Sequence, residues 1–255
     1  MLRVGSSLVG YKIAAEDGAI GTVSDFLFDD RTWKLRWLVV DTGNWLPGRL
    51  VLVHPSAIGA PHDGNEILPV RLTKKQVEDS PDLASDRPVS EQMQRAVYGY
   101  YGWDPLWGNG YFGPGMIGAI PTPVTFVDRD ANRAMEGTVL TDDDGDPHLR
   151  SLTVVKGYDI HATDGNIGHI ENFLIDDTTW QIHYLIADTS NWWFGRHVLI
   201  SPFAVRDIAW ADAIINVNIS RESVKTSPEW NPAELIEEAY QRRLHSHYQW
   251  PGYGW

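Results

Sequence analysis

The sequence predicts a mainly β protein built from two small β-barrels in tandem, each followed by short α-helices. Three observations carry this prediction. The stretch from Gly21 to Pro55 returns without a gap as Gly168 to Pro202, 147 positions later. Short runs of β-branched and aromatic residues, which strands prefer, alternate with turn-forming Gly, Asp and Asn. A chain of 255 residues is long enough for two modest domains with their own cores.

The repeat extends beyond that stretch and sets the domain boundaries. At the same offset Gly10-Tyr11 matches Gly157-Tyr158, and Ser80-Pro81 matches Ser227-Pro228. Two copies at so long a period indicate duplication of a whole domain, not a solenoid of short repeats. The predicted division is domain 1 at 1–103, a Gly/Pro-rich acidic linker at 104–147, and domain 2 at 148–255.

The strands of the first copy follow from the alternation of apolar runs and turns. Asp17-Gly18 is a turn signal, and the polar run from Asp29 to Thr32 is another. The segment 34–40 is rich in β-branched and aromatic residues, and Pro55 ends a short apolar run. The expected strands are 20–28, 34–40, 50–53 and 66–72. Short strands at such close spacing favour a small barrel or a strongly bent sheet.

Each copy then becomes helical. Thr73 to Gln76 fits a capping box before a short helix. A second helix is expected from about Pro88 to Tyr98 in the first copy, and from an N-cap at Asn231 in the second. Both second helices lead into Gly-interrupted aromatic tails that contain Trp103 or Trp250.

The composition argues against several classes of function. The formal net charge of -13 argues against broad contact with nucleic-acid phosphates, which needs clusters of Lys and Arg. The absence of cysteine excludes disulfides and thiolate metal sites. No run of about 18 apolar residues predicts a membrane span, and the N-terminus lacks an apolar signal core. We therefore expect a cytoplasmic protein with no nucleic-acid partner and no transmembrane segment.

The repeated residues resemble the PRC-barrel family. The resemblance rests on Gly10 to Ile13, Asp17 to Gly21 and Phe26 to Asp30, followed by Trp37 to Thr42 and Val51 to Pro55. The second copy carries the same pattern, and His148 to Ser151 resembles the lead-in of bacterial tandem members. The resemblance covers about 2–80 and 149–227. It implies a small, highly bent barrel that holds partner proteins, as in the reaction centre H subunit and a ribosome maturation factor.

The sharpest local feature is a loop that occurs in both copies. In the first copy it contains Asp41, Asn44, Trp45 and Arg49. Its counterparts in the second copy are Asp188, Asn191, Trp192 and Arg196. Trp and Arg are favoured interface anchors, so the loop is a candidate interaction site. The alternative is turn chemistry, in which Asp and Asn cap the turn and Trp closes the end of the barrel.

Other polar clusters have a structural and a chemical interpretation. The pairs Asp29-Asp30 and Asp176-Asp177 favour polar turns over a divalent cation site. The acidic run from Asp142 to Asp146 lacks the ligand spacing of a calcium loop and is expected to be a solvated linker. His245-x-His247 has no third ligand nearby in the sequence. We predict no catalytic, cofactor-binding or metal-binding residue.

The tail residues Trp103 and Trp250 are the second candidate interaction site. They either form a sticky patch for a partner or pack across the other barrel or a second subunit. The predicted function is a non-enzymatic scaffold or adaptor for protein–protein interaction or self-assembly, with a homodimer left open and the protein partner unidentified. The alternative is a small-ligand or metal-dependent activity in the cleft between the barrels, using Asp41 with Asp188 or Asp29 with Asp176.

Overall fold

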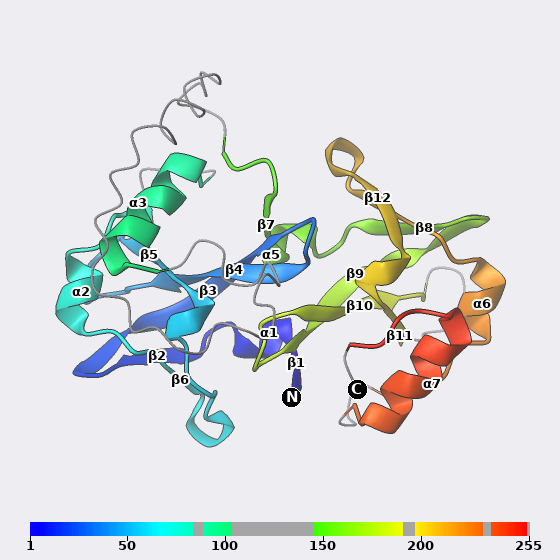
Figure 1. The fold of residues 1–255 in the computed structure, drawn as a ribbon, viewed down its shortest axis with the longest axis horizontal. Coiled ribbons are helices and arrows are strands. Elements are labelled where there is room, and N and C mark those ends of the chain that lie inside the picture. The colour runs from blue at the N-terminus through cyan, green and yellow to red at the C-terminus, as the bar shows by residue number, and fades with distance from the viewer. Residues whose placement is uncertain (84–88, 104–144, 191–196, 232–235, 254–255) are drawn as a thin grey trace, which may run out of the picture.

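A computed structural model describes residues 1–83, 89–103, 145–190, 197–231 and 236–253, and it is mainly β (Figure 1). The first half runs β1 (Leu2–Val4), α1 (Gly5–Leu8), β2 (Lys12–Ala15), β3 (Gly18–Asp29), β4 (Lys34–Asp41), β5 (Leu50–Val53), η1 (Pro55–Ala57), η2 (Asp63–Asn65), β6 (Ile67–Pro69), α2 (Lys74–Glu78) and α3 (Glu91–Tyr101). The second half runs β7 (Leu149–Ser151), α5 (Leu152–Val155), β8 (Asp159–Ala162), β9 (Gly165–Asp176), β10 (Ile182–Asp188), β11 (His197–Ile200), η4 (Pro202–Ala204), β12 (Val205–Ala209), η5 (Trp210–Asp212), β13 (Ile214–Val217), α6 (Arg221–Lys225) and α7 (Glu238–Tyr248). The element order of the first half therefore recurs in the second, with β12 as an addition.

Each half contributes one bent sheet. The order is β5-β4-β3-β2-β6 in the first half and β11-β10-β9-β8-β13-β12 in the second, so neither sheet closes into a barrel. The predicted mainly β fold with two units is confirmed, and each of the two predicted small barrels is an open sheet. The physical reason lies at Pro55 and Pro202, where a 3-10 turn follows β5 or β11 and replaces a hydrogen-bonded ladder. In each sheet the two edge strands, β5 and β6 or β11 and β12, are connected by the chain and are not paired with each other.

The two halves exchange their first strands. Strand β1 pairs with β9 of the second half, with Val4 opposite Leu174. Strand β7 pairs with β3 of the first half, with Ser151 opposite Leu27. Every residue in one pairing lies 147 positions from its counterpart in the other, so the exchange is reciprocal and the halves are related by a pseudo-twofold arrangement.

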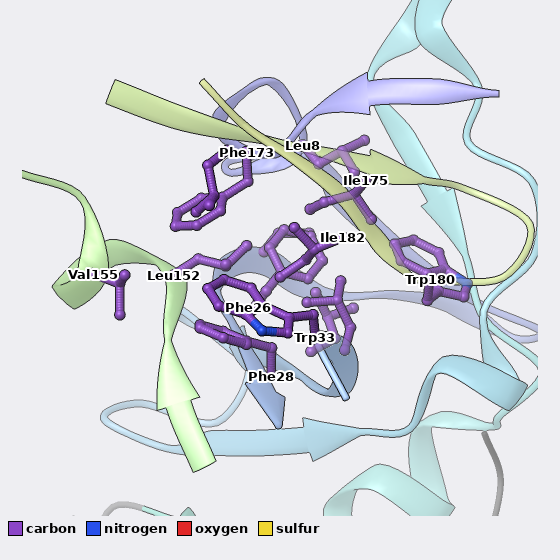
Figure 2. Packing of buried hydrophobic residues seen from close by; sticks show 14 of the residues in the cluster. Leu8, Phe26, Phe28, Trp33, Leu152, Val155, Phe173, Ile175, Trp180 and Ile182 are labelled. Atoms are coloured by element: carbon purple, nitrogen blue, oxygen red, sulfur yellow. The ribbon is translucent and has the colours of Figure 1, made fainter. Parts of the chain in front are cut away.

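The core is continuous across this junction. The turns after β3 and β9 meet where Leu35 N donates to Trp180 O at 2.9 Å and Ile182 N donates to Trp33 O at 2.8 Å. Figure 2 shows Phe26, Phe28 and Trp33 of the first half facing side chains of the second half. The ring centroids of Phe28 and Phe173 lie 6.2 Å apart. The halves therefore share one hydrophobic core, and they pair within the chain.

The long helices cover the outer faces of the sheets. Helix α3 packs on β3, β4 and β5 through Met93, Val97 and Tyr98. Helix α7 takes the same place on β9, β10 and β11, where Leu244 is buried. Helix α3 begins at Glu91, after an N-cap at Ser90, and therefore three residues beyond the expected start at about Pro88. The predicted capping box at Thr73 and Gln76 is confirmed at α2, whereas 232–235, after the expected N-cap at Asn231, lies outside the described residues.

One element differs between the copies. Strand β12 pairs with β13 in the second half, but the equivalent segment of the first half makes only isolated bridges at Ile58 and His62. The sequence explains this difference, because Gly59-Ala60-Pro61 stands where the second copy has Arg206-Asp207-Ile208. Proline has no N–H to donate and glycine weakens a strand. The same backbone path is thus built with two different sets of side chains.

Candidate functional site

The carboxylate pairs at the junction hold the exchanged strands. Asp29 Oδ1 accepts the backbone N–H of Thr32 at 3.0 Å, as the polar-turn interpretation predicts. Burial opposes ionisation of Asp29, but hydrogen bonds from the Arg31 side chain and from the turn outweigh it and lower the pKa of Asp29. The neighbouring carboxylate, Asp30, binds Arg150 of β7 with an Oδ2–Nε distance of 3.2 Å. One member of the pair shapes the turn and the other anchors the strand.

The second copy repeats this division of roles. Asp176 Oδ1 accepts the backbone N–H of Thr179 at 2.7 Å. Asp177 pairs with Arg3 of β1 and with the terminal amine of Met1, whose nitrogen lies 2.7 Å from Asp177 Oδ1. Burial again opposes ionisation of Asp176, but hydrogen bonds from Thr179 and the terminal amine lower its pKa. These carboxylates are already bound to side chains and backbone of the chain itself.

The loop after β4 is a rigid turn. Thr42 is buried, and its hydroxyl donates to Leu46 O at 2.7 Å and lies 2.8 Å from Arg49 O. Asp41 Oδ1 accepts the backbone N–H of Gly43 at 2.8 Å. The Arg49 guanidinium donates to the carbonyls of Glu78, the last residue of α2, and Ser80. Asp41 and Arg49 therefore hold the loop in place, in agreement with the turn-chemistry alternative.

The side chains of Asn44 and Trp45 form none of the hydrogen bonds described for this loop. Asn44 is exposed, and Trp45 is half-buried against the core. The Lys74 ammonium of α2 lies 4.8 Å from the centroid of the Trp45 ring. This contact fixes the direction of the indole, because a cation over the ring face is attracted to it. The loop thus offers a positioned aromatic side chain beside an exposed amide.

The equivalent loop of the second half is described only at its start. Asp188 Oδ1 accepts the backbone N–H of Ser190 at 2.8 Å, and this bond lowers the pKa of Asp188 against the opposing effect of burial. The close backbone approach between β9 and the end of β10 is also present, because a Cβ on Gly168 would lie 1.8 Å from Asp188 O. The candidate residues Asn191, Trp192 and Arg196 lie outside the described residues.

The tail tryptophans face inward. Trp103 stacks on Tyr101 with ring centroids 4.1 Å apart and packs against the α3 face of the first sheet. Trp250 stacks on Tyr248 with centroids 4.2 Å apart, against the α7 face of the second. Each tail therefore packs on its own half, which corrects the expectation that it crosses to the other barrel. The large rings cover the outer sheet face that one helix leaves open.

The histidines of α7 are bound within the fold. The hydroxyl oxygen of Tyr184 lies 2.8 Å from His245 Nε2, and His247 Nε2 lies 2.8 Å from Ser223 O. Burial lowers the pKa of His245. Burial also lowers the pKa of His183, which precedes Tyr184 on β10, to about 4. Tyr253 stacks on His183 with centroids 3.9 Å apart. Among the described residues no group of His, Asp and Glu is arranged to hold a metal ion.

Asp146 is a residue whose role the sequence did not reveal. The acidic run was expected to be a solvated linker, but Asp146 is buried, and the rest of the run at 142–144 lies outside the described residues. Its Oδ2 accepts from Gln94 Nε2 at 2.8 Å and from Arg36 Nη1 at 3.2 Å. Gln94 in turn accepts from Trp37 Nε1 at 2.9 Å. The end of the linker is thus anchored to α3 and β4.

A cleft of about 620 Å³ opens at the junction of the halves. It is lined by the turn 30–33, the segment around β7, and η4, β12 and Trp210 of the second half. Figure 1 shows β7 and β12 on the same side of the junction. Asp41 and Asp188 do not line this cleft. Asp29 and Asp176 accept hydrogen bonds within their own turns. The carboxylate pairs predicted for a cleft site therefore do not form one. Of the predicted site residues that the structure describes, none lines the cleft.

The cleft residues that the sequence analysis missed are found where the copies differ. Phe203, Arg206 and Trp210 stand at the positions of Ser56, Gly59 and Asp63 in the first copy. A comparison of the two copies at the offset of 147 would have identified them. Residues that repeat in both copies indicate what the fold needs. Residues that differ at equivalent backbone positions are candidates for a role other than folding.

Comparison with known proteins gives two results. A family model described as the PRC-barrel domain matches residues 4–77. A protein of Deinococcus radiodurans described as an uncharacterized protein is 36% identical over 74 residues, which is 29% of this chain and 26% of that protein. The chain thus matches about a quarter of the length of this relative. Among the described residues, no helix has the length and apolar character needed to cross a bilayer.

Proposed function

Residues 4–77 are a PRC-barrel domain, and from this premise we propose that the chain is a non-enzymatic scaffold whose loop around Trp45 holds a protein partner. The observation that carries the proposal is the position of that loop. Strand β4 begins at Lys34, beside the junction, and ends at Asp41, so the loop lies at the outer end of the half. Strand β10 runs outward in the same way to Asp188.

The rigidity of the loop supports a binding role. Thr42 and Arg49 tie it to itself and to the end of α2, so Trp45 is presented in one orientation. A partner that binds a preorganised side chain loses less conformational entropy than one that binds a mobile side chain. Tryptophan is among the residues that contribute most to protein interfaces. Asn44 and Trp45 are accordingly the proposed contacts, and Asp41 and Arg49 position them.

The pseudo-twofold arrangement supports a scaffold with two contact loops. The same Asp-Thr-x-Asn-Trp sequence follows β4 and β10, and the shared core fixes the two halves as one body. A single chain would then engage two copies of a partner, or two sites on one partner, with the avidity that linked sites provide. Self-association into a homodimer is another form of the same function. The cytoplasmic location stays a prediction.

The test compares partner recovery by matched variants. Trp45→Ala combined with Trp192→Ala removes both indoles, and Val154→Ala removes an exposed apolar side chain elsewhere. We expect a protein recovered with the wild type and with the Val154 variant to be lost from the double variant. Light scattering coupled to size exclusion reports self-association of the same three proteins. Equal recovery and equal mass for all three, with the fold intact, would contradict the proposal.

A further inference from the structure

The junction cleft carries two cationic side chains, Arg31 and Arg206, that have no counterpart at the equivalent positions of the other copy. Arg31, Arg150 and Arg206 line it together with His148, whereas its carboxylates are Asp30 and Asp207. Each of the three arginines pairs with a carboxylate, Arg31 with Asp29, Arg150 with Asp30 and Arg206 with Asp207. An anion would therefore be bound by guanidinium donors that these pairs leave unused.

Both carboxylates of the cleft, Asp30 and Asp207, already interact with neighbouring side chains. Asp30 is held by His148 Nδ1 at 3.0 Å and by Arg150 Nε at 3.2 Å. Asp207 accepts from Arg206 Nε at 2.7 Å and from Asn216 Nδ2 at 2.6 Å. These bonds satisfy the acidic groups and leave them poor partners for a cationic ligand.

Two guanidinium groups retain donors that these bonds do not use. The Arg31 side chain is 62% exposed, and its contact with Asp29 uses only Nη2. The Arg206 side chain is 63% exposed and uses Nε, so within the described part of the chain its two terminal nitrogens have no hydrogen-bond partner. A guanidinium presents paired N–H groups that match a carboxylate or a phosphate.

Aromatic surface lies beside these donors. Phe203 is 43% exposed and stacks on Tyr253 with ring centroids 5.2 Å apart. Trp210 lies under the Arg150 guanidinium, whose carbon is 4.0 Å from the ring centroid. The cleft therefore combines anion donors with apolar ring surface. Its volume of about 620 Å³ falls within the range typical of small-molecule sites.

The first copy acts as an internal reference for what the fold needs. At the offset of 147, Arg31 of the first copy corresponds to Thr178 of the second. Phe203 and Arg206 of the second copy correspond to Ser56 and Gly59 of the first. The position of Trp210 is taken by Asp63, which accepts from the Tyr11 hydroxyl at 3.2 Å and binds Arg3. The 3-10 turns η1 and η4 form in both copies with these different side chains. The turns therefore form without Arg31, Phe203 or Arg206 at the equivalent positions.

We propose that this cleft binds a small organic anion with an aromatic body, whose carboxylate or phosphate contacts Arg31 and Arg206 and whose ring packs on Phe203 and Trp210. The overall acidity of the chain favours a small ligand over a polyanion such as nucleic acid. This inference does not depend on the loop at Trp45, so the two proposals stand or fall separately.

Titration calorimetry with four naphthalene probes tests the proposal. The probes are 1-naphthoate, 1-naphthyl phosphate, neutral 1-naphthalenemethanol and cationic 1-naphthylmethylammonium. We expect at least one anion to bind about tenfold or more tightly than the neutral and cationic probes, because charge-assisted hydrogen bonds add to the ring contact. The ratio between the two anions distinguishes a carboxylate site from a phosphate site.

Variants place the binding in the cleft. Arg206→Gln and Arg31→Gln are each expected to weaken the anion about tenfold. Phe203→Ala should weaken all naphthalene probes that bind. The matched control is Arg242→Gln, an exposed arginine on α7 that also pairs with a carboxylate and does not line the cleft. The proposal is overturned if no probe binds at millimolar concentration, if the neutral probe binds as tightly as the anions, or if both cleft arginine variants bind like the wild type.

Discussion

Arg150 Nε lies 3.2 Å from Asp30 Oδ2, although 120 positions separate the two residues in the sequence. The same contact is made in the other direction by Arg3 and Asp177. Each exchanged strand is only three residues long and offers few backbone hydrogen bonds. The ion pairs therefore supply an attachment that so short a strand lacks, and they make the junction sensitive to the loss of one charge.

Asp30→Asn should destabilise the protein by about 1–3 kcal/mol. The Asp30 side chain is only 8% exposed, so its removal leaves Arg150 partly buried without a counter-charge. Urea unfolding of Asp30→Asn, Arg150→Gln and the double variant measures the coupling energy. The control is Lys75→Gln, since the Lys75–Asp79 pair on α2 is exposed and should contribute little. Additive effects of the Asp30 and Arg150 variants would contradict this account.

Gly21→Ala should be far more harmful than Gly43→Ala. A Cβ at Gly21 would lie 2.0 Å from Asp41 O, so the β3–β4 pairing would have to shift. Gly43 also has a positive φ but has open space around it, so alanine there costs about 1 kcal/mol of backbone strain. Thermal unfolding should show a loss several times larger for Gly21→Ala. Similar losses at both positions would mean that the close approach is relaxed without cost.

Gln94→Leu should cost about 2–4 kcal/mol of unfolding free energy. It leaves the buried Nε1 of Trp37 without its acceptor and removes a donor from the buried carboxylate of Asp146. The matched control is Gln241→Leu at the equivalent position of α7. Tyr184 keeps its bond to His245 there, so we expect a loss below about 1 kcal/mol. Equal losses in the two halves would refute the difference between these networks.

The stability of the protein should fall between about pH 6.5 and pH 4. Burial lowers the pKa of His183 from 6.5 to about 4, so the folded state disfavours its protonation. A group with a depressed basic pKa contributes stability above its unfolded pKa and loses it as the pH falls through this window. The loss amounts to up to about 3 kcal/mol.

Urea unfolding at several pH values, with His183→Gln as the comparison, measures this dependence. The variant should show a flatter profile between pH 6.5 and pH 4. The carboxylates Asp29 and Asp176 also have lowered pKa values, so their contribution is lost only at more acidic pH, as it falls through the folded pKa. An unchanged profile in the His183 variant would show that other groups govern this pH range.

The duplication, the strands and the capping box at α2 could all be predicted from the sequence, because they depend on local pattern and on a comparison of the copies. The strand exchange could not. Leu2-Arg3 and Leu149-Arg150 are equivalent in the two copies, so each lead-in fits its own half as well as the other. Only the path of the whole chain decides which pairing forms.

The candidate site was predicted in part. The Asp41 turn follows from local chemistry, and the structure contains it. The role of Arg49 does not follow, because its acceptors lie 29 and 31 positions away. The inward packing of Trp103 likewise depends on which face of the sheet the tail meets. The cleft belongs to no single segment, so no local pattern could reveal it.

The reciprocal exchange of β1 and β7 has a consequence for biosynthesis. Strand β3 is complete once residue 29 has left the ribosome, but its partner β7 begins at Leu149. At 5 to 20 residues per second, the first half waits roughly 6 to 24 s for that strand. During this interval its own β1 also has no β9 to join, so a nascent chain exposes both an unpaired strand and an unfilled edge. A neighbouring nascent chain exposes the equivalent strand and edge, so we expect a product whose translation stops before residue 149 to associate with its own kind.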